Sequence, residues 1–176
     1  DSRIHVFTST SEIHMEHMLR KTKEDILKDT RESVKYAKKL CQDVEFSAQD
    51  ATRTDKEFLI EVLKTAVEEG ATTINVPDTV GYATPKDYLD LLQSVYEDVK
   101  GGNEDVIIST HCHNDLGLAV ANSLTAITAG ARQIEGAING IGERAGNTST
   151  EEIIMAIKTR QDQFGVDIKA ETTEIF

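Results

Sequence analysis

The chain has 176 residues, of which 39% are hydrophobic and 28% charged, a composition typical of a globular domain with a sizeable core. The 31 acidic residues outnumber the 19 basic ones, and the net charge of −12 disfavours nucleic acid and anionic membrane surfaces as partners. No apolar run approaches the roughly 18 residues of a membrane span. The two cysteines, Cys41 and Cys112, are too few for a disulfide framework, so we expect a cytoplasmic protein.

Short apolar, β-branched runs recur along the chain and predict strands. The predicted strands cover residues 3–8, 44–47, 72–76, 106–110 and 133–138, with a further strand expected near residues 166–168. The segments between them repeat apolar residues at helical spacing, so each predicts an amphipathic helix. The expected inward faces are Ile26, Thr30, Val34, Ala37 and Leu40; Phe58, Val62 and Ala66; Tyr88, Leu92, Val95 and Val99; and Leu116, Val120, Leu124 and Ile127.

Residues at the boundaries support this division into strands and helices. Asp55 can cap the second helix, and Thr84 followed by Pro85 starts the third. Gly70 and Gly130 are placed where helices would end. The chain therefore predicts four βα units followed by a fifth strand and helix, which is an α/β fold with a parallel sheet.

Repeats of this length fit either an open doubly wound sheet or a (β/α)8 TIM barrel. Polar side chains follow nearly every predicted strand, at residues 8–11, 47–50, 78–79, 111–115 and 139–147. An active site assembled from all the strand ends is typical of a barrel. A complete barrel has eight units, whereas five are clear here, so we predict that residues 1–176 form one partial TIM-barrel domain.

The strongest local signal is the pair His111 and His113 at the end of the fourth predicted strand. Residues two apart in a strand point to the same side, so both imidazoles would converge at the mouth of the sheet. This arrangement suits metal ligands, although two histidines at a strand end can also make ordinary hydrogen bonds. Cys112 would point the other way and is expected to be a small buried residue.

A glycine-rich loop follows the fifth predicted strand, at residues 138–150. Glu143 and Asn147 in this loop are oxygen donors suited to a cation. The loop lacks the spacing of a phosphate-binding P-loop, and a flexible connection that caps the next helix is the simpler alternative.

Two other strand ends carry polar groups with more than one interpretation. Thr79 can donate a hydrogen bond to a carboxylate, but Asp78 and Thr79 can equally form a structural turn. Asp50 and Arg53 are candidates for an internal ion pair that ties neighbouring loops together.

The most specific motifs are residues 111–119, 135–147 and 74–82. Together with residues 3–7 and 44–47, they resemble the α-isopropylmalate synthase family, within the larger group of metal-dependent acyl-CoA condensing and lyase barrels. The resemblance covers essentially the whole chain and corresponds to roughly strands 3 to 7 of a pyruvate carboxyltransferase-like barrel.

The resemblance implies an acyltransferase that condenses acetyl-CoA with 2-oxoisovalerate and hydrolyses the thioester to 2-isopropylmalate, the first step of leucine biosynthesis. It implies a divalent cation (Mn, Zn, Co or Mg) on His111 and His113, with Asn147 completing or supporting the ligand set. It also implies homodimerisation, or self-association of the chain.

The resemblance further assigns His5, Ser47 and Thr79 to the keto acid, Thr79 through its carboxylate. Gln49 and Glu143 are the candidate catalytic residues, and Glu143 would also help to form the wall on which the thioester lies. Gln49 stands where the family usually has a glutamate thought to transfer a proton, and a glutamine cannot accept one in the relevant range.

The chain also departs from the family, because the strand with the Asp-Arg-Glu-type motif is absent. That aspartate is a metal ligand, so we expect the isolated chain to bind metal poorly and to have little activity. Homocitrate synthase, citramalate synthase and a non-catalytic partial barrel are the alternative interpretations.

Overall fold

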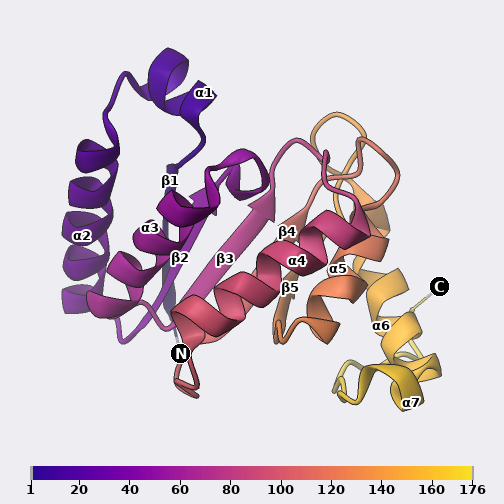
Figure 1. Cartoon of the computed structure of the whole chain (residues 1–176). Coiled ribbons are helices and arrows are strands. Elements are labelled where there is room, and N and C mark those ends of the chain that lie inside the picture. The colour runs from indigo at the N-terminus through magenta and orange to yellow at the C-terminus, as the bar shows by residue number, and fades with distance from the viewer. Residues whose placement is uncertain (1, 176) are drawn as a thin grey trace.

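In the computed structural model, which describes residues 2–175, five strands form a single parallel sheet in chain order (Figure 1). They are β1 (Arg3–Ser9), β2 (Asp43–Gln49), β3 (Thr73–Asp78), β4 (Ile107–Cys112) and β5 (Gln133–Glu135). Each lies on a predicted strand, and the βα loops gather at the end towards which the arrow of β3 points. An α/β fold of the partial-barrel type is therefore confirmed.

Helices follow the strands, and the longer ones pack against their neighbours along one face of the sheet. They are α1 (Glu12–His14), α2 (Lys23–Leu40), α3 (Lys56–Glu68), α4 (Pro85–Val95), α5 (Ala119–Thr128), α6 (Thr150–Thr159) and α7 (Gln161–Phe164). Short 3₁₀ turns follow β2 at Ala51–Arg53 and β5 at Ile138–Gly140, and π-helical turns extend α1 at Met15–Leu19 and α4 at Tyr96–Lys100.

The helix starts are stabilised by the side chains expected from the sequence. Asp55 accepts a hydrogen bond from the backbone of Phe58 at the start of α3, and Thr84 forms a reciprocal capping box with Asp87 ahead of Pro85. Such caps satisfy backbone N–H groups that lack a partner within the helix.

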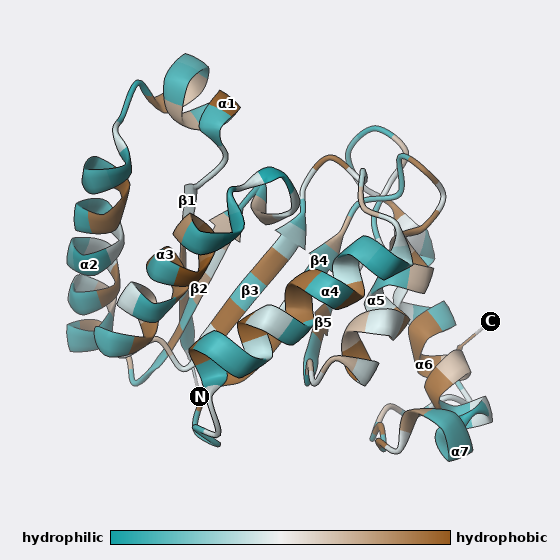
Figure 2. Ribbon diagram, viewed as in Figure 1, coloured by the Kyte–Doolittle hydropathy of each residue, from teal (hydrophilic) through white to brown (hydrophobic). Residues whose placement is uncertain are grey.

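The core lies between the sheet and the helices, and Figure 2 shows apolar stretches along β3 and on the inward sides of α2 and α4. Phe46 and Ile74 of the strands pack with Leu63 and Leu92 of the helices, and all four are fully buried. Most of the predicted inward faces are confirmed, but two residues are not part of them. Leu40, at the last position of α2, and Leu116, three residues before α5, are 64% and 58% exposed.

The expected strand near residues 166–168 is wrong, because this segment is not in the sheet. Val166 and Ile168 instead pack as partly buried side chains against Ile153 and Ile157 of α6. Their apolar character therefore reflects a small second cluster beside α6.

The other face of the sheet is lined largely by polar side chains. Arg3 of β1 donates hydrogen bonds to Glu45 of β2 and to Gln133 of β5, so residues from the two edge strands meet across this face. Barrel interiors are usually filled by branched apolar side chains. The polar lining here leads directly to the candidate site.

Candidate active site

A hollow of about 240 Å³ lies at the carboxyl ends of the strands, where a barrel enzyme collects its reactive groups. Every one of the five strands, or the loop after it, contributes to its lining. The predicted residues in the lining are His5, Ser47, Gln49, Thr79, His111, His113 and Glu143. Asn147, the remaining predicted residue, contacts His111, so the structure brings all the candidates together.

The two histidines converge as their spacing predicts. The ring centroids of His111 and His113 are 5.2 Å apart. Strand β4 ends at Cys112, one residue earlier than the prediction required, but an isolated bridge to Asn147 continues the extended backbone through His113. Cys112 lies on the opposite side, fully buried, and burial raises the pKa of its thiol.

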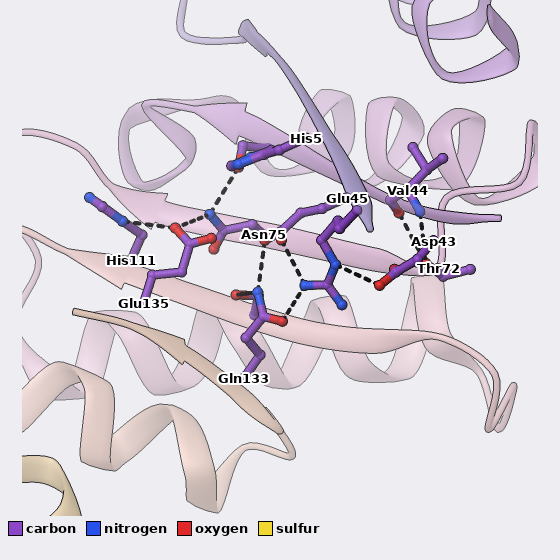
Figure 3. Close-up of polar contacts among 12 residues, drawn as sticks. His5, Asp43, Val44, Glu45, Thr72, Asn75, His111, Gln133 and Glu135 are labelled. Carbon is purple, nitrogen blue, oxygen red and sulfur yellow. Dashed lines mark hydrogen bonds and ion pairs between the residues drawn. The ribbon is translucent and has the colours of Figure 1, made fainter. Parts of the chain in front are cut away.

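Glu135 of β5 orients His111, as Figure 3 shows. Its Oε2 atom lies 2.9 Å from His111 Nδ1 and also accepts a hydrogen bond from Asn75 Nδ2 at 3.2 Å. A carboxylate that accepts a hydrogen bond from Nδ1 favours the tautomer whose Nε2 carries the lone pair, which is how metal-binding histidines are commonly held. In this structure Nε2 lies 3.3 Å from Asn147 Nδ2. The sequence-based prediction missed Glu135; the signal was its position two residues after Gln133, on the same face of a strand.

Asn147 and His113 both present unused polar atoms. Asn147 Oδ1 and His113 Nδ1 are buried and have no hydrogen-bond partner among residues 2–175. Buried polar groups normally have such a partner, and these two atoms, beside His111 at the strand ends, are available to a ligand. Burial lowers the pKa of His113, and repulsion from His111 and Arg144 adds to this effect, which keeps the imidazole neutral and able to coordinate. The donor set therefore fits a divalent cation.

A second group of potential ligands lies beside the first, on β1, β2 and β5. The side chains of His5, Glu45 and Glu135 place ligand atoms within 4.8 Å of one another. These groups already have partners, because both oxygens of Glu45 accept hydrogen bonds, from Arg3 and Gln133, and His5 Nε2 lies 2.7 Å from the Ser47 hydroxyl. We interpret the group as a hydrogen-bonded network beside the site.

The two carboxyl groups of this network, Glu45 and Glu135, have pKa values shifted in opposite directions. Burial and the neighbouring Glu135 raise the pKa of Glu45. Burial opposes ionisation of Glu135 as well, but hydrogen bonds from His111 and Glu45 lower its pKa. Glu135 is therefore the first of the two to ionise, which suits its contact with His111.

Asp78 and Thr79 have different surroundings in the structure. Asp78 is buried and accepts hydrogen bonds from Thr52 and from the backbone of Tyr82 and Ala83, so it forms a structural turn. Thr79 instead lines the hollow, where its Oγ1 accepts a hydrogen bond from the backbone N–H of Asp50 at 2.8 Å.

The predicted ion pair between Asp50 and Arg53 is confirmed. Arg53 Nε and Nη2 donate to the fully buried Asp50 carboxylate at 2.9 and 2.7 Å. The Asp50 carboxylate also lies 3.6 Å from His14 of α1, so it connects the segments that follow β1 and β2.

The parallel sheet, the helices on its outer face and the converging strand-end site define a partial α/β barrel of the enzyme type. A family model described as HMGL-like matches residues 1–176, and the chain belongs to this family.

Curated relatives with high sequence identity carry one name. The chain is 57% identical over 173 residues to a 2-isopropylmalate synthase of Clostridium kluyveri, covering 98% of this chain and 34% of that protein. It is 56% identical over 164 residues to the 2-isopropylmalate synthase of Methylacidiphilum infernorum, covering 93% of this chain and 32% of the relative. The chain thus spans about a third of the length of these relatives.

Solved structures of lower identity share the fold. Hydroxymethylglutaryl-CoA lyase from Pseudomonas aeruginosa superimposes with a TM-score of 0.78 at 19% identity, covering 94% of this chain and 58% of that one. The HMG-CoA lyase from Bacillus subtilis gives a TM-score of 0.77 at 20% identity, covering 99% and 67%. Within residues 2–175, none of the helices is long and apolar enough to cross a membrane.

Proposed function

We propose that this chain is part of an enzyme that condenses acetyl-CoA with 2-oxoisovalerate and releases 2-isopropylmalate and coenzyme A. The observation that carries the proposal is the identity of 52–57% to 2-isopropylmalate synthases across 98–99% of the chain. The convergence of His111, His113 and Asn147 at the strand ends supports it independently.

The ligand set assigned to a divalent cation is His111, His113 and Asn147. A bound cation would act as a Lewis acid on the carbonyl of the keto acid. Glu135 would hold His111 in the required tautomer through the hydrogen bond at Nδ1. The native metal would be Mn, Zn, Co or Mg, because imidazole and amide oxygen ligands do not select one of them.

The keto acid would lie between β1, β2 and β3. Ser47 Oγ accepts a hydrogen bond from Asn75 and lies beside His5 Nε2, so these polar side chains are held on one wall of the hollow. The Oγ1 lone pair of Thr79 is used by the Asp50 N–H, which leaves the Thr79 hydroxyl hydrogen to donate to a substrate carboxylate.

The chemistry requires a base that removes a proton from the acetyl methyl group. The resulting enolate carbon bonds to the keto carbon, whose oxygen takes up a proton, and water then cleaves the thioester to release coenzyme A. Glu143, whose side chain is 81% exposed at the hollow, lies on the wall assigned to the thioester.

The proposal is tested by assaying release of free coenzyme A by the complete gene product with Mn²⁺ and acetyl-CoA. We expect turnover with 2-oxoisovalerate to exceed that with pyruvate or 2-oxoglutarate. Preference for pyruvate or 2-oxoglutarate would instead indicate a citramalate or homocitrate synthase, and no release with any of them would indicate a non-catalytic barrel. Light scattering on the same sample tests the accompanying proposal of a homodimer.

Gln49 provides a prediction of its own. It lines the hollow but cannot act as a base, so in the complete gene product we expect Gln49→Glu to raise kcat, by about tenfold or more if the new carboxylate takes part in general base catalysis. Steady-state rates across pH measure this, with Gln42→Glu on the exposed connection before β2 as the control. An unchanged rate would remove position 49 from the proton path.

A further inference from the structure

Arg144, in the loop after β5, connects the loops that follow three different strands. Its Nε and Nη2 atoms donate to the two carboxylate oxygens of Asp115, in the loop after β4, at 2.8 and 2.9 Å. Its Nη2 atom also donates to the backbone carbonyl of Thr79, in the loop after β3, at 2.9 Å. A bidentate guanidinium fixes orientation as well as distance, so this contact defines where Thr79 lies.

The surrounding backbone is shaped to permit this contact. Arg144 adopts a left-handed conformation with φ of +56°, which costs energy for a residue with a Cβ atom. Gly81 adopts a φ of +61°, and a Cβ at this position would lie 2.7 Å from the backbone N and Oδ2 of Asp115. Both features indicate that the loops after β3, β4 and β5 pack closely around the Arg144 and Asp115 pair.

Thr79 is consequently held from two sides. Arg144 binds its carbonyl oxygen, and the Asp50 N–H binds its hydroxyl oxygen at 2.8 Å. Asp50 is itself held by the bidentate contact with Arg53. With these contacts in place, the hydroxyl hydrogen of Thr79 remains available to bind a ligand in the hollow.

We propose that Arg144 and Asp115 are positioning residues that set the affinity of the site for the carboxylate of a 2-oxo acid by holding Thr79. This inference rests on the proposed function, because it takes the 2-oxo acid as the ligand of Thr79. Neither residue touches the substrate, and their effect is transmitted through the Thr79 carbonyl.

A purely structural ion pair would behave differently from a positioning pair. Loss of a structural pair lowers stability whether or not Thr79 can bind substrate. Loss of a positioning pair weakens substrate binding only while the Thr79 hydroxyl is present. A double-mutant cycle between positions 79 and 115 therefore separates the two roles.

The experiment measures the Kd of 2-oxoisovalerate by titration calorimetry on the complete gene product with saturating Mn²⁺. Thr79→Val removes a hydrogen bond to a charged group and should raise Kd by about tenfold or more. Asp115→Asn keeps the side-chain shape but removes the charge that holds Arg144, and should raise Kd by about three- to tenfold. We expect the double variant to match Thr79→Val alone. Asp162→Asn, which breaks an exposed bidentate pair with Arg160, is the matched control and should not change Kd.

Each outcome separates the inference from the proposed function. If the unaltered protein binds the keto acid, either of two results overturns the positioning role while the proposed function stands. One is that the fold-changes in Kd of the two single variants multiply in the double variant. The other is that Asp115→Asn leaves Kd unchanged. If the unaltered protein does not bind 2-oxoisovalerate at all, both fall. Thermal unfolding shows whether each variant is folded. If Asp115→Asn does not fold, Arg144→Lys tests the same contact between positions 144 and 115.

Discussion

Replacing His111 and His113 together with alanine is expected to lower the affinity for Mn²⁺ or Zn²⁺ by at least about 100-fold. Loss of a group that merely orients a metal ligand typically costs about 10- to 100-fold in affinity, and this variant removes two ligands outright. The ring centroids are 5.2 Å apart with the ring planes tilted by 54°, and burial keeps His113 neutral by lowering its pKa. Of the proposed ligand set, Asn147 alone would remain.

Titration calorimetry of the complete gene product with each metal, with and without 2-oxoisovalerate, measures this effect. Binding of the metal should tighten when the keto acid is present, since both would share the site. His17→Ala is the matched control, because the His17 side chain is 69% exposed and lies outside the hollow. Equal metal binding by the double variant and the unaltered protein would show that the cation binds elsewhere.

Gly142→Ala is expected to weaken metal binding by about 10- to 100-fold without removing a ligand. A Cβ atom at Gly142 would lie 2.7 Å from Asn147 Cγ and closer still to Oδ1, so the Asn147 side chain must move. Gly142 is not among the glycines with positive φ, so its backbone accepts alanine and the effect comes from the collision alone.

The control for this variant is Gly102→Ala. Gly102 has a φ of +85°, and nothing lies within 4 Å of a Cβ built there, so alanine strains the backbone without touching the site. Metal affinity measured as above should fall for Gly142→Ala and stay unchanged for Gly102→Ala. If both variants bind metal normally, Asn147 tolerates displacement and is not a required ligand.

Local patterns in the sequence determined the strands and the helix starts. Residues 3–8 and 106–110 are β-branched and apolar enough to specify strands, and β1 and β4 lie on them. Thr84 and Pro85 begin α4 because capping depends on side chains only a few residues apart. The convergence of His111 and His113 was predictable for the same reason, since their relative direction follows from the period of two in a strand.

Leu40 and residues 166–168 show where such patterns fail. Apolar character indicates that a side chain tends to be buried, but not which surface buries it. Leu40 continues the apolar stripe of α2 beyond the point where the sheet covers it. Val166 and Ile168 are β-branched, yet they pack beside α6 rather than in the sheet.

The sequence by itself determined the α/β class, the order of the elements and most of the strand-end residues that line the hollow, although not Glu135. Only the tertiary structure decided which of these residues contact one another. Glu135 binds His111 across 24 positions, and Arg144 binds the Thr79 carbonyl across 65, separations at which no local periodicity relates two side chains. These contacts exist because neighbouring parallel strands bring their carboxyl ends to one edge, and the register between strands then sets which groups lie within hydrogen-bond distance.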